Sequence, residues 1–359
     1  MNILFIPHVP NRKIINRVYE FSKNSNSYFL SWQIENSSLQ AKVLSQLQSL
    51  FSFIKLEDNI VTIPLLFKPE SLATKLNTKM LNYAIKKFKI EMVVNANALL
   101  FDIRDINVPV FYDLVDDHIT TNADIGLTPL RVKKIEQDIR DSRGVICVTT
   151  VLEEKVKYLN SNTITVENGL YIERFKQAKS LKKELGLEGK KVFGYIGGVD
   201  EWTGIDRACE SYREIRDETT AMIVVGDSKS GFFRALKEQY KKEKYKEDII
   251  FTGLISPDRV GDYFKTLDVG LIPFKLNNFT NNAYPIKALE YGLAGVEVIS
   301  TPLTVLKEKT FPFIHFYDIG EFAVAMKRIE KREREFDFSE LSWQKQSRKL
   351  IDFIKKAEQ

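Results

Sequence analysis

Short, continuously apolar runs recur along the chain, and longer stretches with helical spacing separate them. Such runs are typical of buried parallel strands, because a sheet covered by helices on both faces needs apolar side chains on both. The runs predict strands at 2–6, 27–32, 60–65, 91–95, 108–113, 144–149, 163–167, 191–196, 221–226, 248–252, 268–273, 296–300 and 313–317. Helical spacing is clear at 69–88 and 127–141. Two successive series of this kind predict two doubly wound α/β domains.

The two series meet within 168–190, where the turn pair Asn168-Gly169 is followed by a charged stretch without a strand pattern. We therefore expect one domain at 1–170 and a second at 171–337. Residues 338–359 follow the last strand and carry apolar positions at helical spacing among charges, which predicts a final amphipathic helix.

Composition and charge exclude some classes of protein. With 44% hydrophobic and 28% charged residues the chain reads as a soluble globular protein. Its net charge of +5 is too small to indicate a nucleic-acid partner. The basic excess is locally dense in 66–90, where one acid, Glu70, faces the lysines Lys68, Lys75, Lys79, Lys86, Lys87 and Lys89. That segment suits an anionic membrane surface or acceptor, although an ordinary exposed helix fits at least as well.

The N-terminal sequence, the hydropathy and the cysteines bear on the cellular location. The start MNILFIPHVPN has no basic region, and its apolar run is too short for a signal peptide. No window approaches the roughly 18 apolar residues of a spanning helix. Cys147 and Cys209 show no metal or disulfide spacing. We expect a cytoplasmic protein whose membrane contact, if any, is peripheral and on the inner face.

Candidate chemistry is sought in the turns that follow the strands, because open parallel sheets bind ligands outside the carboxyl ends of their strands. The first such turn lacks G-x-G-x-x-G, which argues against a dinucleotide-dependent dehydrogenase. After the strand ending in GYI, Gly197 and Gly198 could let a phosphate approach the backbone and the next helix. A tight structural turn explains the same glycines equally well.

The most informative stretch is LIPFKLNNFTNNAYPIKALEYGLAGVEVIST, in which a strand ends at Pro273 and a helix is expected from Pro285. Lys287 lies in the first turn, where a cation opposes the helix dipole unless an anion is bound there. Glu290 lies on the same face, one turn deeper, and could accept hydrogen bonds from ribose hydroxyls. An exposed Lys–Glu pair on a surface helix is the plain alternative.

A third candidate follows the strand VPVFYD. Asp116, Asp117 and His118 stand there close to Asp113 and form a plausible acid–base cluster. A helix cap with solvated acids is the alternative, and Asp113 could be structural. Since the histidines are far apart in sequence and the acids lack a ligand spacing, no metal site is predicted.

Together these segments resemble bacterial glycosyltransferases of GT-B architecture, the family-4-like group that builds surface polysaccharides. The segments that carry the resemblance are DLVDDH, VENGLYIERF, GYIGGVDEWTGID and the stretch from IPFKL to VIST, in the family's order. The resemblance implies two Rossmann-like domains facing a central cleft. It also implies that the C-terminal domain binds the nucleotide sugar, that the N-terminal domain binds the acceptor, and that the final helix crosses back to the N-terminal domain.

Carried over by position, the resemblance places Glu290 at the ribose and Lys287 at the diphosphate. The other implied donor contacts are Gly197, Gly198, Gly253, Leu254, Ile255, Asn281, Asn282, Tyr284, Pro285 and Ile286. In an inverting enzyme Asp116 or Asp117 would be the base, whereas in a retaining enzyme His118 could contact the donor sugar. The expected reaction is metal-independent hexosyl transfer from a UDP-sugar, or next a GDP-sugar, to a glycan or lipid-linked acceptor, without a further cofactor.

The chain also departs from the family pattern. Asn282 stands where many members have the first of two glutamates, and Glu201, Trp202 and Thr203 follow the glycine turn where Arg and Lys are common. These departures leave the stereochemistry open. They also keep a second hypothesis, a catalytically inactive binding or scaffold subunit of a polysaccharide-assembly complex. An epimerase or a phosphorylase of the same fold is a third and weaker one.

Overall fold

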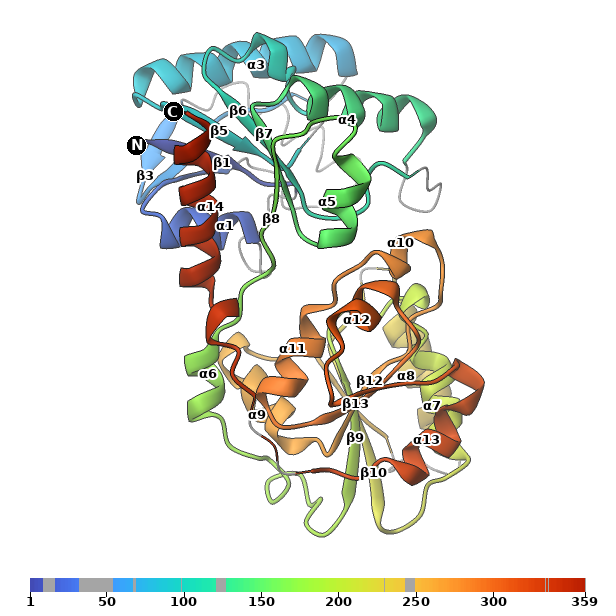
Figure 1. Ribbon diagram of the computed structural model, residues 1–359. Helices are drawn as coiled ribbons and strands as arrows, with labels where there is room; N and C mark the ends of the chain where they lie inside the picture. The colour runs from blue at the N-terminus through green and yellow to red at the C-terminus, as the bar shows by residue number, and fades with distance from the viewer. Residues whose placement is uncertain are drawn as a thin grey trace. The chain divides into compact units, whose positions relative to one another are not determined.

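The computed structural model describes residues 1–8, 17–31, 54–66, 69–97, 99–120, 127–228, 230–242, 249–332, 334 and 336–358. The chain forms two compact units, which Figure 1 shows. The first unit comprises Met1–Gly169 together with Trp343–Gln359, and the second comprises Leu170–Ser342. Each unit has its own sheet, and each is described by itself.

The first unit is built on an eight-stranded sheet in the order β3-β4-β2-β1-β5-β6-β7-β8. Its strands are β1 (Ile3–Ile6), β2 (Tyr28–Ser31), β3 (Lys55–Glu57), β4 (Ile60–Thr62), β5 (Met92–Asn95), β6 (Val110–Leu114), β7 (Gly144–Cys147) and β8 (Thr163–Thr165). All neighbours run parallel except β3 and β4. The order reverses between β1 and β5, and such a switch point is where a doubly wound sheet binds ligands.

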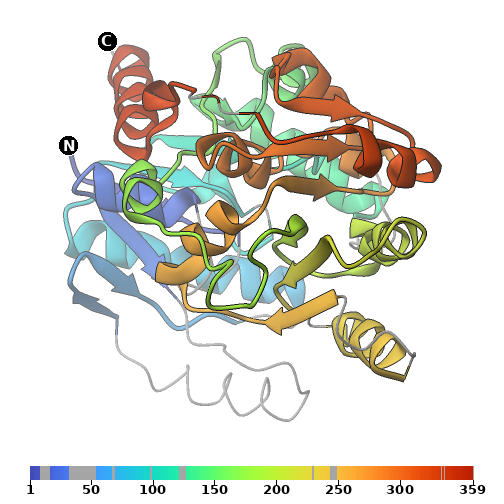
Figure 2. The same ribbon diagram turned by 90° about the horizontal axis from the view of Figure 1, so that it is seen from below.

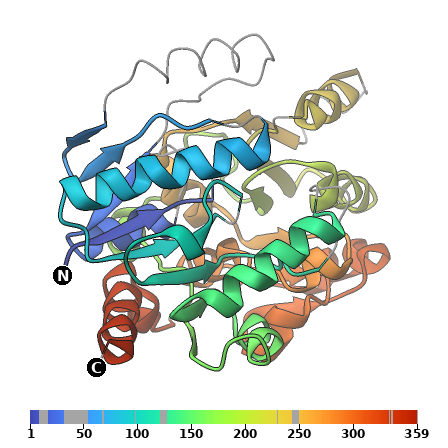
Figure 3. The same cartoon turned by 90° about the horizontal axis from the view of Figure 1, so that it is seen from above.

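Helices cover both faces of this sheet. On one face α1 (Arg17–Asn24) packs beside α14 (Trp343–Ala357), and on the other lie α3 (Glu70–Lys87) and α4 (Pro129–Asp141), as Figures 1 and 3 show. A shorter helix, α5 (Thr150–Val156), and a 3₁₀ turn, η1 (Ile103–Asp105), complete the described helical segments. The central strands β1, β5, β6 and β7 are buried throughout, which explains their uninterrupted apolar sequences.

The second unit has a six-stranded, wholly parallel sheet in the order β11-β10-β9-β12-β13-β14. Its strands are β9 (Lys191–Ile196), β10 (Thr220–Val225), β11 (Ile249–Gly253), β12 (Val269–Ile272), β13 (Glu297–Ser300) and β14 (Ile314–Phe316). The switch point lies between β9 and β12. It is flanked by the two sequence segments that carry the glycine turn and Lys287.

Helices also cover both faces of the second sheet. Figures 1 and 2 show α7 (Ile205–Arg213), α8 (Phe232–Lys242) and α13 (Phe322–Arg328) on one face, with α9 (Val260–Thr266) and α11 (Ile286–Leu293) on the other. Two short helices, α10 (Asn278–Asn281) and α12 (Thr304–Lys309), follow β12 and β13. Elements that follow these strands lie at the carboxyl edge of the sheet, where the candidate site is expected.

The predicted strands are all present, and the predicted helices at 69–88 and 127–141 are α3 and α4. The structure adds β3, an exposed edge strand that pairs antiparallel with β4 through Asp58 and Asn59. These two residues have φ of 47° and 64°, which is typical of a type I′ hairpin turn. The strand was missed because its residues are all exposed and carry no apolar alternation.

The second unit spans Leu170–Ser342, whereas the sequence predicted a domain at 171–337. The charged stretch after Leu170 contains a helix, α6 (Ile172–Gln177), whose Phe175 is buried against Phe264 at 5.6 Å between ring centres. The final helix begins at Trp343 and not at Phe338. Phe338 instead packs on Phe313 within the second unit, so the apolar pattern from 338 onward spans two different cores.

Helix α14 belongs to the first unit through close packing. Trp343 is buried and packs edge-on against Phe21 at 5.7 Å. A Cβ at Gly169 would lie 2.5 Å from the Trp343 ring, so this approach requires glycine. The amide N–H of Glu167 donates to the Gln346 side chain at 2.9 Å. Among the described helices, none combines the length and the apolar content needed to cross a bilayer.

Candidate functional site

The turns after β9, β10 and β11 are joined in series at the carboxyl edge of the second sheet. The amide of Gly197 donates to the carbonyl of Val225 at 3.0 Å, and the amide of Gly226 donates to that of Gly253 at 3.0 Å. The three glycines have φ of +143°, +132° and +75°, values that favour glycine. A Cβ at Gly226 would lie 1.8 Å from the Gly197 carbonyl oxygen. The sequence prediction named Gly197 and Gly253 but missed Gly226, which also ends an apolar strand run.

At the carboxyl edge of the second sheet, the backbone of the Gly197-Gly198 turn is half-buried at Gly197 and exposed at Gly198. The Tyr195 hydroxyl donates to the Gly198 carbonyl at 2.6 Å, which fixes the turn from beneath. A Cβ on Gly198 would meet only the Asp200 carboxylate, at 3.9 Å. The backbone of Gly198 is therefore accessible to a ligand, and its contact with a phosphate stays a prediction.

Lys287 fills the space that the absent side chain of Gly197 leaves. Its ammonium lies 3.7 Å from the centre of the Tyr195 ring and 5.2 Å from that of Phe274. A Cβ on Gly197 would be 2.5 Å from the Lys287 Nζ. No carboxylate lies within ion-pair distance of this ammonium in the described part of the chain. The faces of these two aromatic rings stabilise the cation.

The electrostatics of Lys287 follow from this setting. Burial lowers the pKa of Lys287 to about 7, and the charge of Glu290 opposes that shift. Helix α11 begins at Ile286 after Pro285, and no side chain caps its first turn. The Ala288 amide donates to the Pro285 carbonyl at 2.9 Å, which leaves the amides of Ile286 and Lys287 for an anion that would also meet the Lys287 ammonium.

Glu290 lies one turn further along α11 and is 7% exposed. Burial raises the pKa of Glu290 to about 7, while Arg174 and then Lys287 lower it. Arg174 lies on α6, and its guanidinium stacks on the Tyr171 ring at 4.4 Å. Sequence reasoning missed Arg174 as a charge partner, although it lies in the VENGLYIERF segment that carried the resemblance.

The predicted loop before α11 is partly helical. Asn277 caps α10 by accepting from the Thr280 amide at 2.8 Å. The side-chain amide of Asn282 donates to the Asn278 carbonyl at 3.1 Å, and Tyr284 is buried. Asn281 is half-buried, and its side chain makes no hydrogen bond with another described residue. Of the amides predicted in this loop, Asn281 is the one left available to a ligand.

The turn after β11 joins the same edge through Gly253. Its neighbour Leu254 is 81% exposed, and Ile255 is half-buried. The structure thus places Gly253 in the series of glycine turns, with Leu254 projecting into solvent beside it.

In the first unit, the structure shows a buried ion pair that was not predicted, and it includes Asp113, close in sequence to Asp116 and Asp117. The Arg17 guanidinium binds both oxygens of Asp113, at 3.1 and 2.8 Å. Both side chains are almost fully buried, and Arg17 also donates to the carbonyl of Val166 at 2.9 Å. Asp113 is therefore a structural residue that fixes α1 against β6.

The two predicted bases have different surroundings. Asp117 is buried and accepts from the Lys155 ammonium at 2.7 Å and from the Thr120 hydroxyl at 2.9 Å. Burial raises the pKa of Asp116 to about 7, with Arg17 opposing and Asp117 adding to that shift. Asp116 is thus suited to exchange a proton near neutral pH, whereas Asp117 is held in an ion pair.

His118 and His8 face the same edge of the first sheet. Burial and, to a smaller extent, the nearby His8 lower the pKa of His118 to about 4, against the opposing charge of Asp117. Burial also lowers the pKa of His8. The His118 imidazole is therefore neutral at neutral pH and can donate as well as accept hydrogen bonds. The Asn97 side chain donates to the His8 carbonyl at 3.3 Å, which joins the turns after β1 and β5 at the switch point.

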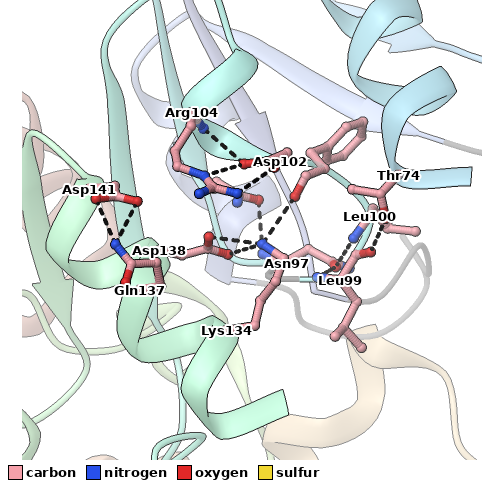
Figure 4. A network of polar contacts seen from close by, with 12 residues as sticks. Thr74, Asn97, Leu99, Leu100, Asp102, Arg104, Lys134, Gln137, Asp138 and Asp141 are labelled. Atoms are coloured by element: carbon pink, nitrogen blue, oxygen red, sulfur yellow. Dashed lines mark hydrogen bonds and ion pairs between the residues drawn. The ribbon is translucent and has the colours of Figure 1, made fainter. Parts of the chain in front are cut away.

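Figure 4 shows the polar contacts that hold the turn after β5 against α4. The Asn97 side chain accepts from the amides of Leu99 and Leu100, at 3.0 and 3.3 Å. The Lys134 ammonium binds both oxygens of Asp138 at 2.9 Å, and burial raises the pKa of Asp138 to about 6. Lys134 also donates to the Phe101 carbonyl at 3.5 Å, which joins α4 to the segment after β5.

Over the described ranges, no group of three or more His, Cys, Asp or Glu side chains is placed to hold a metal ion. Cys147 and Cys209 are buried and unbonded.

Parts of this chain are similar to known proteins. Residues 190–331 match the family described as Glycosyl transferases group 1. A putative teichuronic acid biosynthesis glycosyltransferase, TuaH of Bacillus subtilis, is 25% identical over 162 residues, 45% of this chain and 39% of that protein. Alpha-monoglucosyldiacylglycerol synthase of Streptococcus pneumoniae is 22% identical over 217 residues, 55% of this chain and 47% of that protein. The chain thus matches less than half the length of either relative.

A solved structure matches the whole chain. Anabaena Alr3699/HepE in complex with UDP-glucose superposes with a TM-score of 0.68 at 13% sequence identity, over 100% of this chain and 98% of that chain. At this identity the match shows the fold. The two parallel-sheet units have the GT-B architecture, as the sequence resemblance predicted.

Proposed function

We propose that this chain, which has the GT-B fold and whose residues 190–331 form a domain of the Glycosyl transferases group 1 family, is a glycosyltransferase of cell-surface polysaccharide synthesis. It transfers a hexose from a nucleotide-sugar donor, a UDP-sugar first and a GDP-sugar second, to a glycan or lipid-linked acceptor. One observation carries the proposal. The Lys287 ammonium lies at a glycine turn of the switch point without a carboxylate counter-ion.

The donor diphosphate lies, in this proposal, between the Gly197-Gly198 turn and the first turn of α11. Lys287 and the free amides of that turn supply positive charge, and Glu290 accepts from the ribose hydroxyls. The match to a protein solved with UDP-glucose supports UDP as the first nucleotide to test.

The chemistry requires that negative charge on the leaving diphosphate be stabilised. Lys287 and the α11 amides are fixed before the reaction, and such preorganised groups can contribute several kcal/mol to transition-state stabilisation. We therefore propose transfer without a metal ion. For an inverting reaction Asp116 is the base, because its pKa of about 7 suits proton transfer and Asp117 is engaged by Lys155. For a retaining reaction His118 contacts the donor sugar.

We also propose that the first unit docks on an anionic membrane from the cytoplasmic side through α3. Lys75, Lys79 and Lys86 share the outward face of this helix with Leu72 and Tyr83, which are 52% and 59% exposed. Among the described residues, none of the α3 lysines forms an ion pair, and Lys68 lies outside the described residues. Exposed apolar side chains between unpaired lysines suit a lipid interface.

Vesicle co-sedimentation tests the docking proposal. The double variant Lys75→Glu/Lys79→Glu should lose binding to vesicles that contain phosphatidylglycerol, since each lysine near such a surface contributes roughly 1 kcal/mol. Lys349→Glu/Lys356→Glu, on exposed positions of α14 across the sheet, makes the same change in charge and should retain binding. Equal effects of both variants, or binding that ignores phosphatidylglycerol, would contradict docking through α3.

A transfer assay tests the enzymatic proposal. The protein is incubated with labelled UDP-hexoses and bacterial membrane extract, and label is sought in lipid-linked or polymeric product. Wild type should transfer one hexose, and Glu290→Ala should lose roughly 100-fold or more, as removal of a donor contact in a transition state commonly does. Nucleotide binding without any transfer would favour the scaffold hypothesis instead.

A further inference from the structure

A half-exposed tryptophan stands at the switch point of the second unit. Trp202 lies in the 3₁₀ turn Glu201–Thr203, directly after the glycine turn, and is 40% exposed. Its indole packs on Phe274 at 4.9 Å and on Phe279 at 6.4 Å between ring centres. Because the ring is exposed at the carboxyl edge of the sheet, part of its apolar surface is open to a ligand there.

The backbone around Trp202 is fixed on the segment that follows β12. The Trp202 carbonyl accepts from the Lys275 amide at 3.0 Å, and Lys275 pairs with Glu201 at 3.5 Å. Gly204 has φ of +64°, and a Cβ there would lie 2.1 Å from the Pro273 carbonyl oxygen. The indole is therefore held in place before any ligand arrives, and little conformational entropy is lost on binding.

Phe274 connects Trp202 to the cation of the site. The Phe274 ring packs against the indole on one side and lies 5.2 Å from the Lys287 ammonium. The indole is thus one aromatic ring away from the group that we assign to the diphosphate. In a nucleotide sugar the hexose is bonded directly to that diphosphate.

The other side chains of the turn Glu201–Thr203 are not suited to bind a phosphate. Thr203 is fully buried and donates to the Asp200 carbonyl at 2.6 Å, so its hydroxyl is used within the turn. Glu201 is an acid, and Lys275 is paired with it. What the turn offers to a ligand is the apolar surface of Trp202.

We propose that Trp202 is a sugar platform, on which the C–H face of the donor hexose packs while Lys287 holds the diphosphate; this rests on the donor-binding function proposed above. The C–H bonds of a pyranose carry slight positive charge, and the face of an indole carries slight negative charge. Trp202 therefore contributes to the affinity for the sugar and not to the affinity for the nucleotide.

Calorimetric titration of wild type, Trp202→Ala and Trp202→Phe with UDP and with UDP-glucose, UDP-galactose and UDP-N-acetylglucosamine tests the proposal. We expect Trp202→Ala to bind UDP within about twofold of wild type and to lose about tenfold in affinity for the preferred UDP-hexose, with Trp202→Phe in between. Intrinsic fluorescence, measured in a Trp32→Phe background, gives a second readout, because of the two remaining tryptophans Trp343 is buried and Trp202 is exposed. The emission change on adding UDP-hexose should be absent in Trp202→Phe.

Two results would overturn the platform. A parallel loss for UDP and UDP-hexose would show that Trp202 only supports the turn, and unchanged affinity for both would show no donor contact. Failure of wild type to bind UDP, its sugars, or GDP titrated alongside them would instead refute the proposed function, so the two failures are distinguishable.

Discussion

At the scale of single residues, the candidate site contains buried charges that do not by themselves stabilise the folded protein. Lys287 is held among aromatic rings beside Gly197, with a pKa lowered to about 7 and no carboxylate partner in the described chain. A cation in such a place costs stability unless an anion joins it. Function explains its presence better than folding does, since active sites commonly retain groups that destabilise the free protein.

This argument predicts opposite effects of Lys287→Met on stability and on binding. The free energy of unfolding should rise by about 1 kcal/mol, and nucleotide affinity should fall by about tenfold or more. The pKa of Lys287 is lower in the folded than in the unfolded chain, so the unfolded chain binds more protons above pH 7 and wild-type stability gains with pH there. Urea unfolding at pH 6 and pH 9 should show this gain in wild type and a smaller gain in Lys287→Met. A destabilised variant would contradict the argument.

The ion pair of Arg17 and Asp113 predicts a different pattern. Arg17→Met leaves the Asp113 carboxylate buried without its partner and should cost about 3–5 kcal/mol of unfolding free energy. Arg17→Met/Asp113→Leu removes both charges and should recover much of that loss. The exposed pair of Arg259 and Glu184 is the control, and Arg259→Met should cost less than about 1 kcal/mol. A double variant as unstable as Arg17→Met would contradict this account.

At the scale of elements, the series of glycine turns sets the shape of the donor edge. Gly226→Ala would place a Cβ 1.8 Å from the Gly197 carbonyl oxygen, at a φ that already disfavours alanine. Gly253→Ala shares the positive φ but would meet no atom within 4 Å. The two positions therefore differ in the backbone contact and in φ, since +132° at Gly226 lies further from the left-handed helical region than +75° at Gly253.

We expect Gly226→Ala to destabilise the second unit by about 2 kcal/mol more than Gly253→Ala, because backbone atoms must shift to admit the methyl group. Thermal unfolding followed by circular dichroism measures the difference. Nucleotide affinity should also fall in Gly226→Ala, since the Gly197 turn moves with it. Equal destabilisation by the two variants would show that the contact between the turns does not matter.

Elements were predictable from sequence where burial leaves a long pattern. The buried parallel strands and helices α3 and α4 appear as apolar runs and helical spacing, and the structure has them there. β3 and α10 were missed because a hairpin turn and an asparagine cap make them, without an apolar pattern. The position of Lys287 and Glu290 at a helix start was predictable, because Pro285 and the preceding strand fix it.

Partners across the fold were not predictable. Arg17 meets Asp113 across 96 residues, and Lys155 meets Asp117 across 38. Nothing local marks such pairs, so the sequence could not separate a structural Asp113 from the exchangeable Asp116. Tyr195 and Phe274 as the aromatic surround of Lys287 depend in the same way on the strand order of the second sheet.

At the scale of the whole molecule, the chain has two units with separate cores, and α14 completes the first. A ligand that binds only the second unit should therefore stabilise only that unit. With UDP at about 100 times its Kd, the stabilisation is about 2.7 kcal/mol. Differential scanning calorimetry should show two transitions, of which UDP shifts one. A common shift of both, or a shift only of the transition assigned to the first unit, would contradict the placement of the donor.

Deletion of 343–359 assigns the transitions. Without Trp343 and Gln346, the first unit loses its packing on Phe21 and a hydrogen bond to Glu167. We expect the first unit's transition to fall and the UDP-dependent transition to remain. Loss of UDP binding in the shortened chain would show that the second unit depends on α14.

The central claim is that the second unit binds a nucleotide diphosphate through Lys287 and Glu290, and one calorimetric titration tests it most directly. Wild type, Glu290→Ala and the control Lys183→Met, which removes an exposed lysine of the same unit, are titrated with UDP, GDP, ADP and TDP without added metal. We predict micromolar binding of UDP to wild type and Lys183→Met, with a loss of about tenfold or more in Glu290→Ala. Absence of binding to all four nucleotides, or equal binding by Glu290→Ala, would contradict the account.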